Sequence, residues 1–255
     1  SRRCEELDTD IFTTRLMLKP VTCVRGAAAA KMFYEGDRLT RTGGAMPPTV
    51  LRLLQDKGSV QQLDGSAHRR RKALFVDLVM NAGAEAALVA LFREEWARAR
   101  QDWARRPSIV LLDEAYLVLT RTACRWMGLP LEEVSDTTLA HDLGAMIERT
   151  GRFGPGVVAA LLRRRRVERW LEDLVRATRE EPAAVETPLT VIAGYREGDG
   201  SLLTPADAAV EILNIVRPTA AIARYVMFVA MALEDDERTR SGTRIPVHLV
   251  VRGTA

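Results

Sequence analysis

The sequence predicts a mainly α-helical protein with a few short strands, and three observations carry this prediction. Several long windows repeat their apolar residues with the period of an amphipathic helix. Proline, glycine or a polar capping residue ends most of these windows. Two short runs, 21–24 and 247–251, read as β-strands. We therefore expect helices to build the core.

The expected elements follow one another without a low-complexity linker. A strand at 21–24 opens the series, and a lone strand at 247–251 closes it. Pro107 suits an early helical position, and Thr204 can cap a helix whose first residue is Pro205. The expected helices are 27–34, 49–54, one from residue 66, 85–103, 107–127, 137–149, 157–178, 187–196 and 205–233.

Composition and charge exclude several classes of protein. The chain has 255 residues, 47% hydrophobic and 28% charged, which excludes a disordered or collagen-like chain. Its net charge of +3 is too small to indicate a nucleic-acid partner. Three cysteines, Cys4, Cys23 and Cys124, provide neither a disulfide framework nor a zinc site. We expect a reducing compartment and a cytoplasmic protein.

The helix expected at 205–233 is apolar enough to span a bilayer. However, Glu211, Arg217 and Arg224 interrupt it, and each is costly at membrane depth. A central helix of a soluble core is the better interpretation, so we expect no membrane span.

Arg217 and Pro218 break two local rules at adjacent positions of this helix. Proline removes a backbone hydrogen bond from a helix, and a buried arginine needs a partner. A kinked helix that points a guanidinium into an apolar cavity would suit an amphiphilic ligand with a carboxylate head. The alternative is a structural ion pair with Glu211 or another acid, and the spacing slightly favours that alternative.

Two basic clusters offer a second pair of alternatives. His68 and Arg71 lie three residues apart, so one helix face can present both to an anion such as a phosphate or propionate. From the residues alone, a solvated basic face is the better interpretation, because Arg69, Arg70 and Lys72 surround them. The run Arg163–Arg166 could bind nucleic acid, but a solvated helix face is the better interpretation because no aromatic pattern accompanies it. His141 and His248 lack the spacing of metal ligands.

The combined motifs resemble the fatty-acid peroxygenase branch of the cytochrome P450 superfamily. The similarity covers nearly all of residues 4–237, and the Arg–Pro pair of the long helix is specific to this branch. The matching segments are Lys31–Tyr34, Val60–His68, Arg71–Lys72, Ser108–Glu114, Trp126–Pro130 and Asn214–Thr219.

This resemblance implies a haem cofactor and roles for five residues. Arg217 would bind the fatty-acid carboxylate, which would act as the acid–base that helps to cleave hydrogen peroxide, and Pro218 would shape the helix above the haem. Gln61 would line the pocket and weakly favours hydroxylation over decarboxylation, while His68 and Arg71 would bind the haem propionates. Fatty acid and hydrogen peroxide would be the substrates of this oxidoreductase, a peroxygenase or monooxygenase, without a dedicated redox partner.

The chain departs from the pattern of this family near Glu237. None of its cysteines lies in a glycine-rich loop of the kind that supplies the axial thiolate to the iron. We therefore expect a truncated cytochrome P450 fold that lacks the C-terminal haem-ligand half. Residues 1–240, through the long helix at about 204–234, would form the N-terminal part of one domain, and 241–255 a divergent tail. The alternative function is a non-enzymatic remnant, or a helical protein that binds an apolar ligand.

Overall fold

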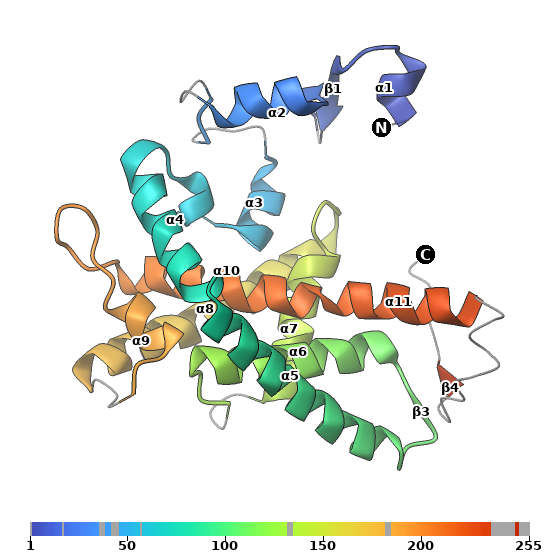
Figure 1. Cartoon of the computed structure of the whole chain (residues 1–255), viewed down its shortest axis with the longest axis vertical. Coiled ribbons are helices and arrows are strands. Elements are labelled where there is room, and N and C mark those ends of the chain that lie inside the picture. Colours follow the sequence, from blue (N-terminus) through green and yellow to red (C-terminus); the bar gives the residue numbers. More distant parts are fainter. Residues whose placement is uncertain are drawn as a thin grey trace.

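The chain is mainly α-helical, as predicted (Figure 1). A computed structural model describes residues 2–16, 18–35, 39–41, 46–56, 58–131, 135–181, 185–235 and 248–249. The described helices are α1 (Arg2–Glu6), α2 (Ala27–Tyr34), α3 (Pro48–Leu54), the 3-10 helix η1 (Val60–Gln62), α4 (Gly65–Val79), α5 (Ala82–Trp103), α6 (Leu111–Met127), α7 (Asp136–Glu148), α8 (Pro155–Glu180), α9 (Pro188–Ala193), α10 (Pro205–Ala221) and α11 (Ala223–Asp235). The described strands are β1 (Ile11–Leu16), β2 (Lys19–Val24), β3 (Ser108–Ile109) and β4 (His248–Leu249).

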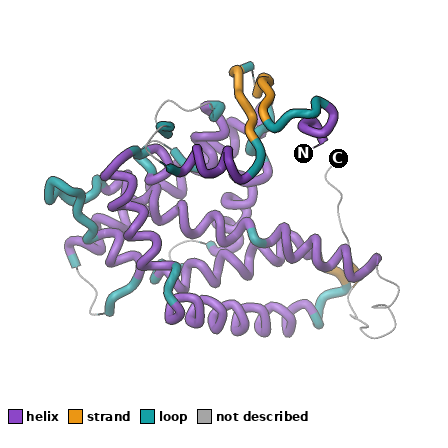
Figure 2. Tube along the Cα trace, turned by 45° about the horizontal axis from the view of Figure 1, so that its top comes forward, coloured by secondary structure: helices purple, strands orange, loops and turns teal. Residues whose placement is uncertain are grey.

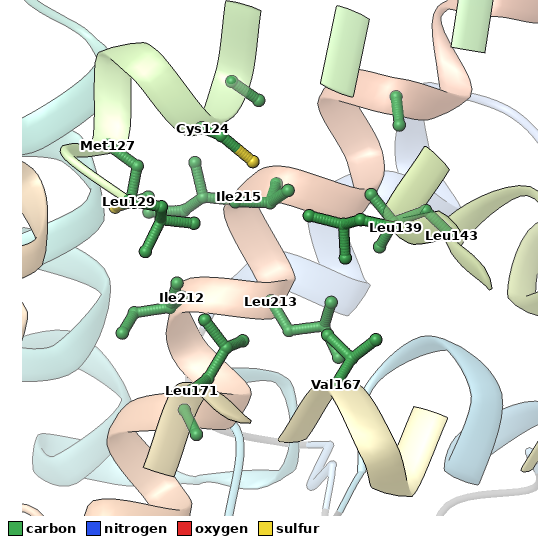
Figure 3. Packing of buried hydrophobic residues seen from close by; sticks show 14 of the residues in the cluster. Cys124, Met127, Leu129, Leu139, Leu143, Val167, Leu171, Ile212, Leu213 and Ile215 are labelled. Carbon is green, nitrogen blue, oxygen red and sulfur yellow. The ribbon is translucent and has the colours of Figure 1, made fainter. Parts of the chain in front are cut away.

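Helix α10 is the centre of the core. It packs against α6, α7, α8 and α9, so residues 208–217 are all buried. Figure 3 shows Ile212 and Leu213 of α10 among side chains of α7 and α8, including Leu139 and Leu171. A helix that is apolar on nearly every side is stable only when other elements surround it. Truncating a fully buried leucine such as Leu213 to alanine would cost about 2–5 kcal/mol.

The start of α10 agrees with the predicted cap, whereas its end does not agree with one unbroken helix. The Thr204 hydroxyl accepts a hydrogen bond from the backbone N–H of Asp207 at 3.0 Å, and Pro205 occupies the first turn. Helix α10 then ends at Ala221, and its C-cap is Ile222, four residues after Pro218. Proline lacks an N–H and its ring crowds the preceding turn, so the regular hydrogen-bond ladder is weakened just before this break.

The two halves of the long helical stretch differ in burial. Pro205–Leu233 is, among the described residues, one stretch long and apolar enough to cross a bilayer. Its α10 half is nevertheless the core of the helical body, which agrees with the core interpretation. The α11 half packs on α6 but exposes Tyr225, Phe228 and Val229.

Two small sheets accompany the helices. Strands β1 and β2 pair in antiparallel register beyond the helical body (Figure 2). The strand at 21–24 is confirmed as part of β2, whereas β1 was not expected, although Ile11, Thr13 and Thr14 are β-branched and favour a strand. Pro107 does not start a helix: β3 follows it, and α6 begins at Leu111. Strand β3 pairs in parallel with β4, the described part of the strand expected at 247–251. Most of the tail expected at 241–255 lies outside the described residues.

Candidate functional site

Arg217 is buried in the C-terminal half of α10, and its guanidinium contacts a backbone carbonyl of another helix rather than an acid. Its Nη1 donates to the Leu53 carbonyl of α3 at 3.0 Å, and Nη2 lies 3.5 Å from Asn214 Oδ1. Arg164 of α8 donates to the same Leu53 carbonyl at 2.9 Å. Burial lowers the pKa of Arg217 to about 9, and the neighbouring charge of Arg164 contributes to this fall. Among the described residues, no carboxylate forms an ion pair with Arg217.

The second guanidinium at this carbonyl is neutralised. Arg164 Nε lies 2.6 Å from Glu168 and 3.5 Å from Asp56, and its side chain is buried. The expectation of a solvated face for Arg163–Arg166 is therefore wrong for Arg164, because α8 turns this arginine inward against α3. Two cations thus meet at one backbone oxygen, and within the described part of the chain only Arg164 has a carboxylate partner.

Asn214 connects Arg217 to Gln61. Its Nδ2 donates to Gln61 Oε1 and to Glu211 Oε2, both at 3.2 Å. Its Oδ1 faces Arg217, so the donors and acceptors around it define one orientation of the amide. Gln61 therefore uses its oxygen as the acceptor from Asn214, which leaves the Gln61 amide nitrogen for other partners. Gln61 belongs to η1, so these contacts join η1 to α10.

Glu211 is fully buried one turn before Asn214, and it pairs with Arg71 rather than with Arg217. Its Oε1 accepts from the backbone N–H of Val60 at 2.6 Å and lies 3.2 Å from Arg71 Nη1. Burial raises the pKa of Glu211, while Asn214 and Arg71 oppose this rise. The alternative of an ion pair between Glu211 and Arg217 is wrong, because Glu211 pairs with Arg71 of α4 instead.

Arg71 is buried rather than solvated, which corrects the alternative of a solvated basic face for this residue. It forms a second ion pair with Glu197 and donates to the carbonyl of Gly58, while its Nε has no hydrogen-bond partner. His68, one turn earlier on α4, is half-buried, and its Nδ1 lies 2.9 Å from the carbonyl of Val60. Its Nε2 makes no hydrogen bond to the described residues.

The described cavity lies away from these residues. It measures about 230 Å³ and opens between α7 and α8. Its walls are Ser135, Thr138, Leu139, Asp142, Arg166, Val167 and Trp170. None of the predicted site residues lines it, so it is separate from the Arg217 region. The described residues also contain no cluster of three or more histidine, cysteine or acidic side chains that could hold a metal ion.

Comparison with known proteins now identifies the fold. No family model matches the chain. Cytochrome P450SP alpha (CYP152B1), solved with (R)-ibuprofen, superposes with a TM-score of 0.87 and 38% sequence identity over 94% of this chain. The chain belongs to the cytochrome P450 superfamily.

Two further cytochrome P450 structures support this assignment. Cytochrome P450EX alpha (CYP152N1), solved with myristic acid, matches at 31% identity and a TM-score of 0.85 over 96% of this chain. A variant of cytochrome P450 OleT in complex with arachidonic acid matches at 31% identity and the same TM-score. The chain spans 59% of the P450SP alpha chain. The recognition of a partial P450 fold from the sequence is confirmed.

The residues of this P450 chain fit a haem only in part. Among the described residues, the ring Nε2 of His68 and the buried Nε of Arg71 have no hydrogen-bond partner, so both could bind an anionic group such as a propionate. On the iron side, no cysteine is suited to be the thiolate ligand. Cys124 is buried in the middle of α6, and burial raises the pKa of its thiol to about 12, so it stays protonated. Cys4 is buried in α1, and Cys23 lies in strand β2.

Sequence reasoning missed three members of this site. Asn214 was noted only as part of a motif, although its position three residues before Arg217 places both on one helix face. No sequence motif indicates Glu197 or the carbonyl of Leu53, because only the tertiary fold brings Glu197 to Arg71 and Leu53 to Arg217. Pro218 lies within α10 after Arg217, as expected.

Proposed function

We propose that this chain forms the substrate-binding part of a haem-thiolate fatty-acid peroxygenase, an oxidoreductase of the cytoplasm. Its substrates would be a fatty acid and hydrogen peroxide, and its products hydroxylated or decarboxylated fatty acids. The solved P450 relatives contain ibuprofen, myristic acid and arachidonic acid, which are all carboxylic acids with an apolar body. This shared chemistry supports a carboxylate ligand for the present chain.

One observation carries the proposal: Arg217 is a buried guanidinium without a carboxylate among the described residues. An unpaired buried cation is costly, and the charge of Arg164 beside it increases this cost. A fatty-acid carboxylate at Arg217 would supply the missing counterion through charge-assisted hydrogen bonds. The apolar surroundings of α10 would suit the acyl chain.

The orientation of Gln61 would complete the carboxylate site. Because Asn214 donates to the Gln61 oxygen, the Gln61 amide nitrogen is the group available to a ligand. An N–H donor there would complement a carboxylate, as does the guanidinium of Arg217. A carboxylate held in this way could act as the general acid–base that moves a proton between the two oxygens of hydrogen peroxide. No redox partner would then be needed.

His68 and Arg71 would hold the haem propionates in the complete site. When bound, a haem with a thiolate ligand supplies the iron chemistry that favours O–O cleavage. The described cysteines do not supply that thiolate, so no step on the iron is assigned to residues of this chain. Glu211 and Glu197 compete with a propionate for Arg71, which makes His68 the more available of the two.

A titration of the purified chain with myristic acid, followed by calorimetry, tests the carboxylate site. We expect the acid to bind and its methyl ester not to bind, because only the acid can pair with Arg217. Arg217→Met should weaken binding about 10–100-fold, the value of one or two hydrogen bonds to a charged group. Arg224→Met removes a charge from α11 in a partly exposed ion pair with Glu148, so it serves as the matched control.

Two outcomes would contradict the proposal. Equal affinity for acid and ester would show that the acyl chain alone is recognised, which is the alternative of an apolar-ligand binder. Unchanged affinity in Arg217→Met would remove the carboxylate anchor. The haem is tested separately by adding hemin and recording the Soret band: His68→Ala should lower haem retention, and unaltered retention would assign His68 a structural role only.

A further inference from the structure

The first half of α8 and the segment before it carry an apolar surface that the proposed function does not use. Phe153 is 80% exposed, and Val158 and Leu162 are each 58% exposed. Val158 and Leu162 are four residues apart in a helix, so they lie on one side of it. The opposite side of α8 packs into the core through residues such as Val167. These exposed side chains therefore point away from the helical body.

The same stretch concentrates positive charge. Residues 149–169 contain seven arginines and one acid, whereas the whole chain has a net charge of only +3. Arg165 and Arg169 are exposed on the side of α8 that carries Val158 and Leu162, at spacings of seven and eleven residues from Val158. Arg152 is exposed just before the helix.

These cations lack internal counterions. No carboxylate pairs with Arg152, Arg165 or Arg169 among the residues that the structure describes. Farther along the same helix the charges are balanced, since Arg176 pairs with Glu172 and Asp173. The charge excess is thus confined to the part of α8 that also exposes apolar side chains. We call Arg152, Phe153, Val158, Leu162, Arg165 and Arg169 the basic-apolar face.

We propose that the basic-apolar face docks the protein onto the surface of an anionic lipid bilayer. Apolar side chains flanked by arginines are the pattern of helices that lie in the membrane interface. The apolar groups would enter the boundary between headgroups and acyl chains, while the arginines would meet the phosphates. A nucleic acid would use the arginines but would leave Val158 and Leu162 in water. The exposed aliphatic residues therefore favour lipid over nucleic acid.

Vesicle flotation of the purified chain tests this docking surface. We expect binding to vesicles that contain phosphatidylglycerol, a weaker response to pure phosphatidylcholine, and a loss of binding as salt increases. Each arginine near the surface should strengthen binding about fivefold, which is about 1 kcal/mol. The double variant Arg165→Gln/Arg169→Gln should then bind about 30-fold more weakly. Phe153→Ser should weaken binding to the anionic vesicles at every salt concentration.

A matched control separates this face from a general charge effect. Arg93→Gln/Arg100→Gln removes two exposed arginines from α5, so it changes the net charge equally, and it should bind as the wild type does. An equal loss in the two double variants would overturn the proposal. The proposal would also be overturned if Tyr225→Ser/Phe228→Ser lost vesicle binding while Arg165→Gln/Arg169→Gln kept it, because α11 would then be the docking face. Retention on DNA that depends on Arg165 and Arg169, without vesicle binding, would assign the face to nucleic acid.

Discussion

Replacing Arg217 by methionine should stabilise the ligand-free chain. Methionine keeps a long unbranched side chain and removes the buried charge. Burial lowers the pKa of Arg217 to about 9, and this fall from the ordinary value of arginine corresponds to roughly 5 kcal/mol of unfavourable burial. The variant loses the hydrogen bond to Leu53, worth about 1–2 kcal/mol, but that carbonyl keeps its bond from Arg164. The contact with Asn214, at 3.5 Å, contributes little. A net gain of about 3–4 kcal/mol in the free energy of unfolding remains, which lies within the range seen when buried charges are replaced by apolar groups.

Urea denaturation at neutral pH, without fatty acid, measures this gain as a higher midpoint with an unchanged slope. The pH dependence provides a second readout. Because the pKa of Arg217 is lower in the folded than in the unfolded chain, the charge penalty is complete below pH 9 and is relieved as the pH rises above it. The advantage of Arg217→Met over the wild type should therefore shrink at alkaline pH. Arg224→Met should change stability by about 1 kcal/mol or less, since its ion pair is partly exposed.

A loss of stability in Arg217→Met of about 1 kcal/mol or more would refute this reasoning. Such a loss would show that Arg217 contributes to folding and already has a counterion in the free protein. Stabilisation together with lost fatty-acid binding would instead identify Arg217 as a functional group that the fold holds at a cost in stability.

Three further predictions concern groups around the site. Arg164→Ala should lower the free energy of unfolding by about 3–5 kcal/mol in urea, because it removes the buried cation that pairs with Glu168 and leaves Asp56 without one of its two arginine partners. A change within the error of the measurement would contradict these ion pairs. Cys124 should resist alkylation at pH 8 while the less buried Cys23 reacts, because burial keeps the Cys124 thiol protonated. Mass spectrometry of the labelled peptides measures this difference, and equal labelling of the two cysteines in the folded chain would argue against the burial of Cys124. Tyr116→Phe should cost about 1 kcal/mol in thermal unfolding, because the phenol donates to Glu148 at 3.0 Å; no effect would show that water replaces this bond.

Local features of the fold could be predicted from the sequence, and the start of α10 is the clearest case. Thr204 and Pro205 act within the first turn of the helix, so neighbouring residues contain all the necessary information. The sequence predicted one kinked helix as far as Leu233, whereas the structure separates α10 from α11 at Ile222, because the packing of the turn after Pro218 decides whether the helix continues. The helix start predicted at Pro107 was wrong because of a long-range contact. Strand β3 pairs with β4, a segment about 140 residues away in the chain, and this pairing overrides the local preference for a helix.

The sequence by itself determined that the protein is helical, that Arg217 lies in an apolar helix, and that the motifs are those of a cytochrome P450. Only the tertiary structure decided which partners the charged residues have. Glu211 meets Arg71 across 140 residues of sequence, and Arg217 meets Leu53 across 164. Helix period and capping act over a few residues, whereas a buried charge is satisfied by whichever group the packing brings within about 3 Å. For that reason the sequence could not separate an ion pair from a ligand site at Arg217, and the structure, by placing Glu211 elsewhere, favours the ligand site.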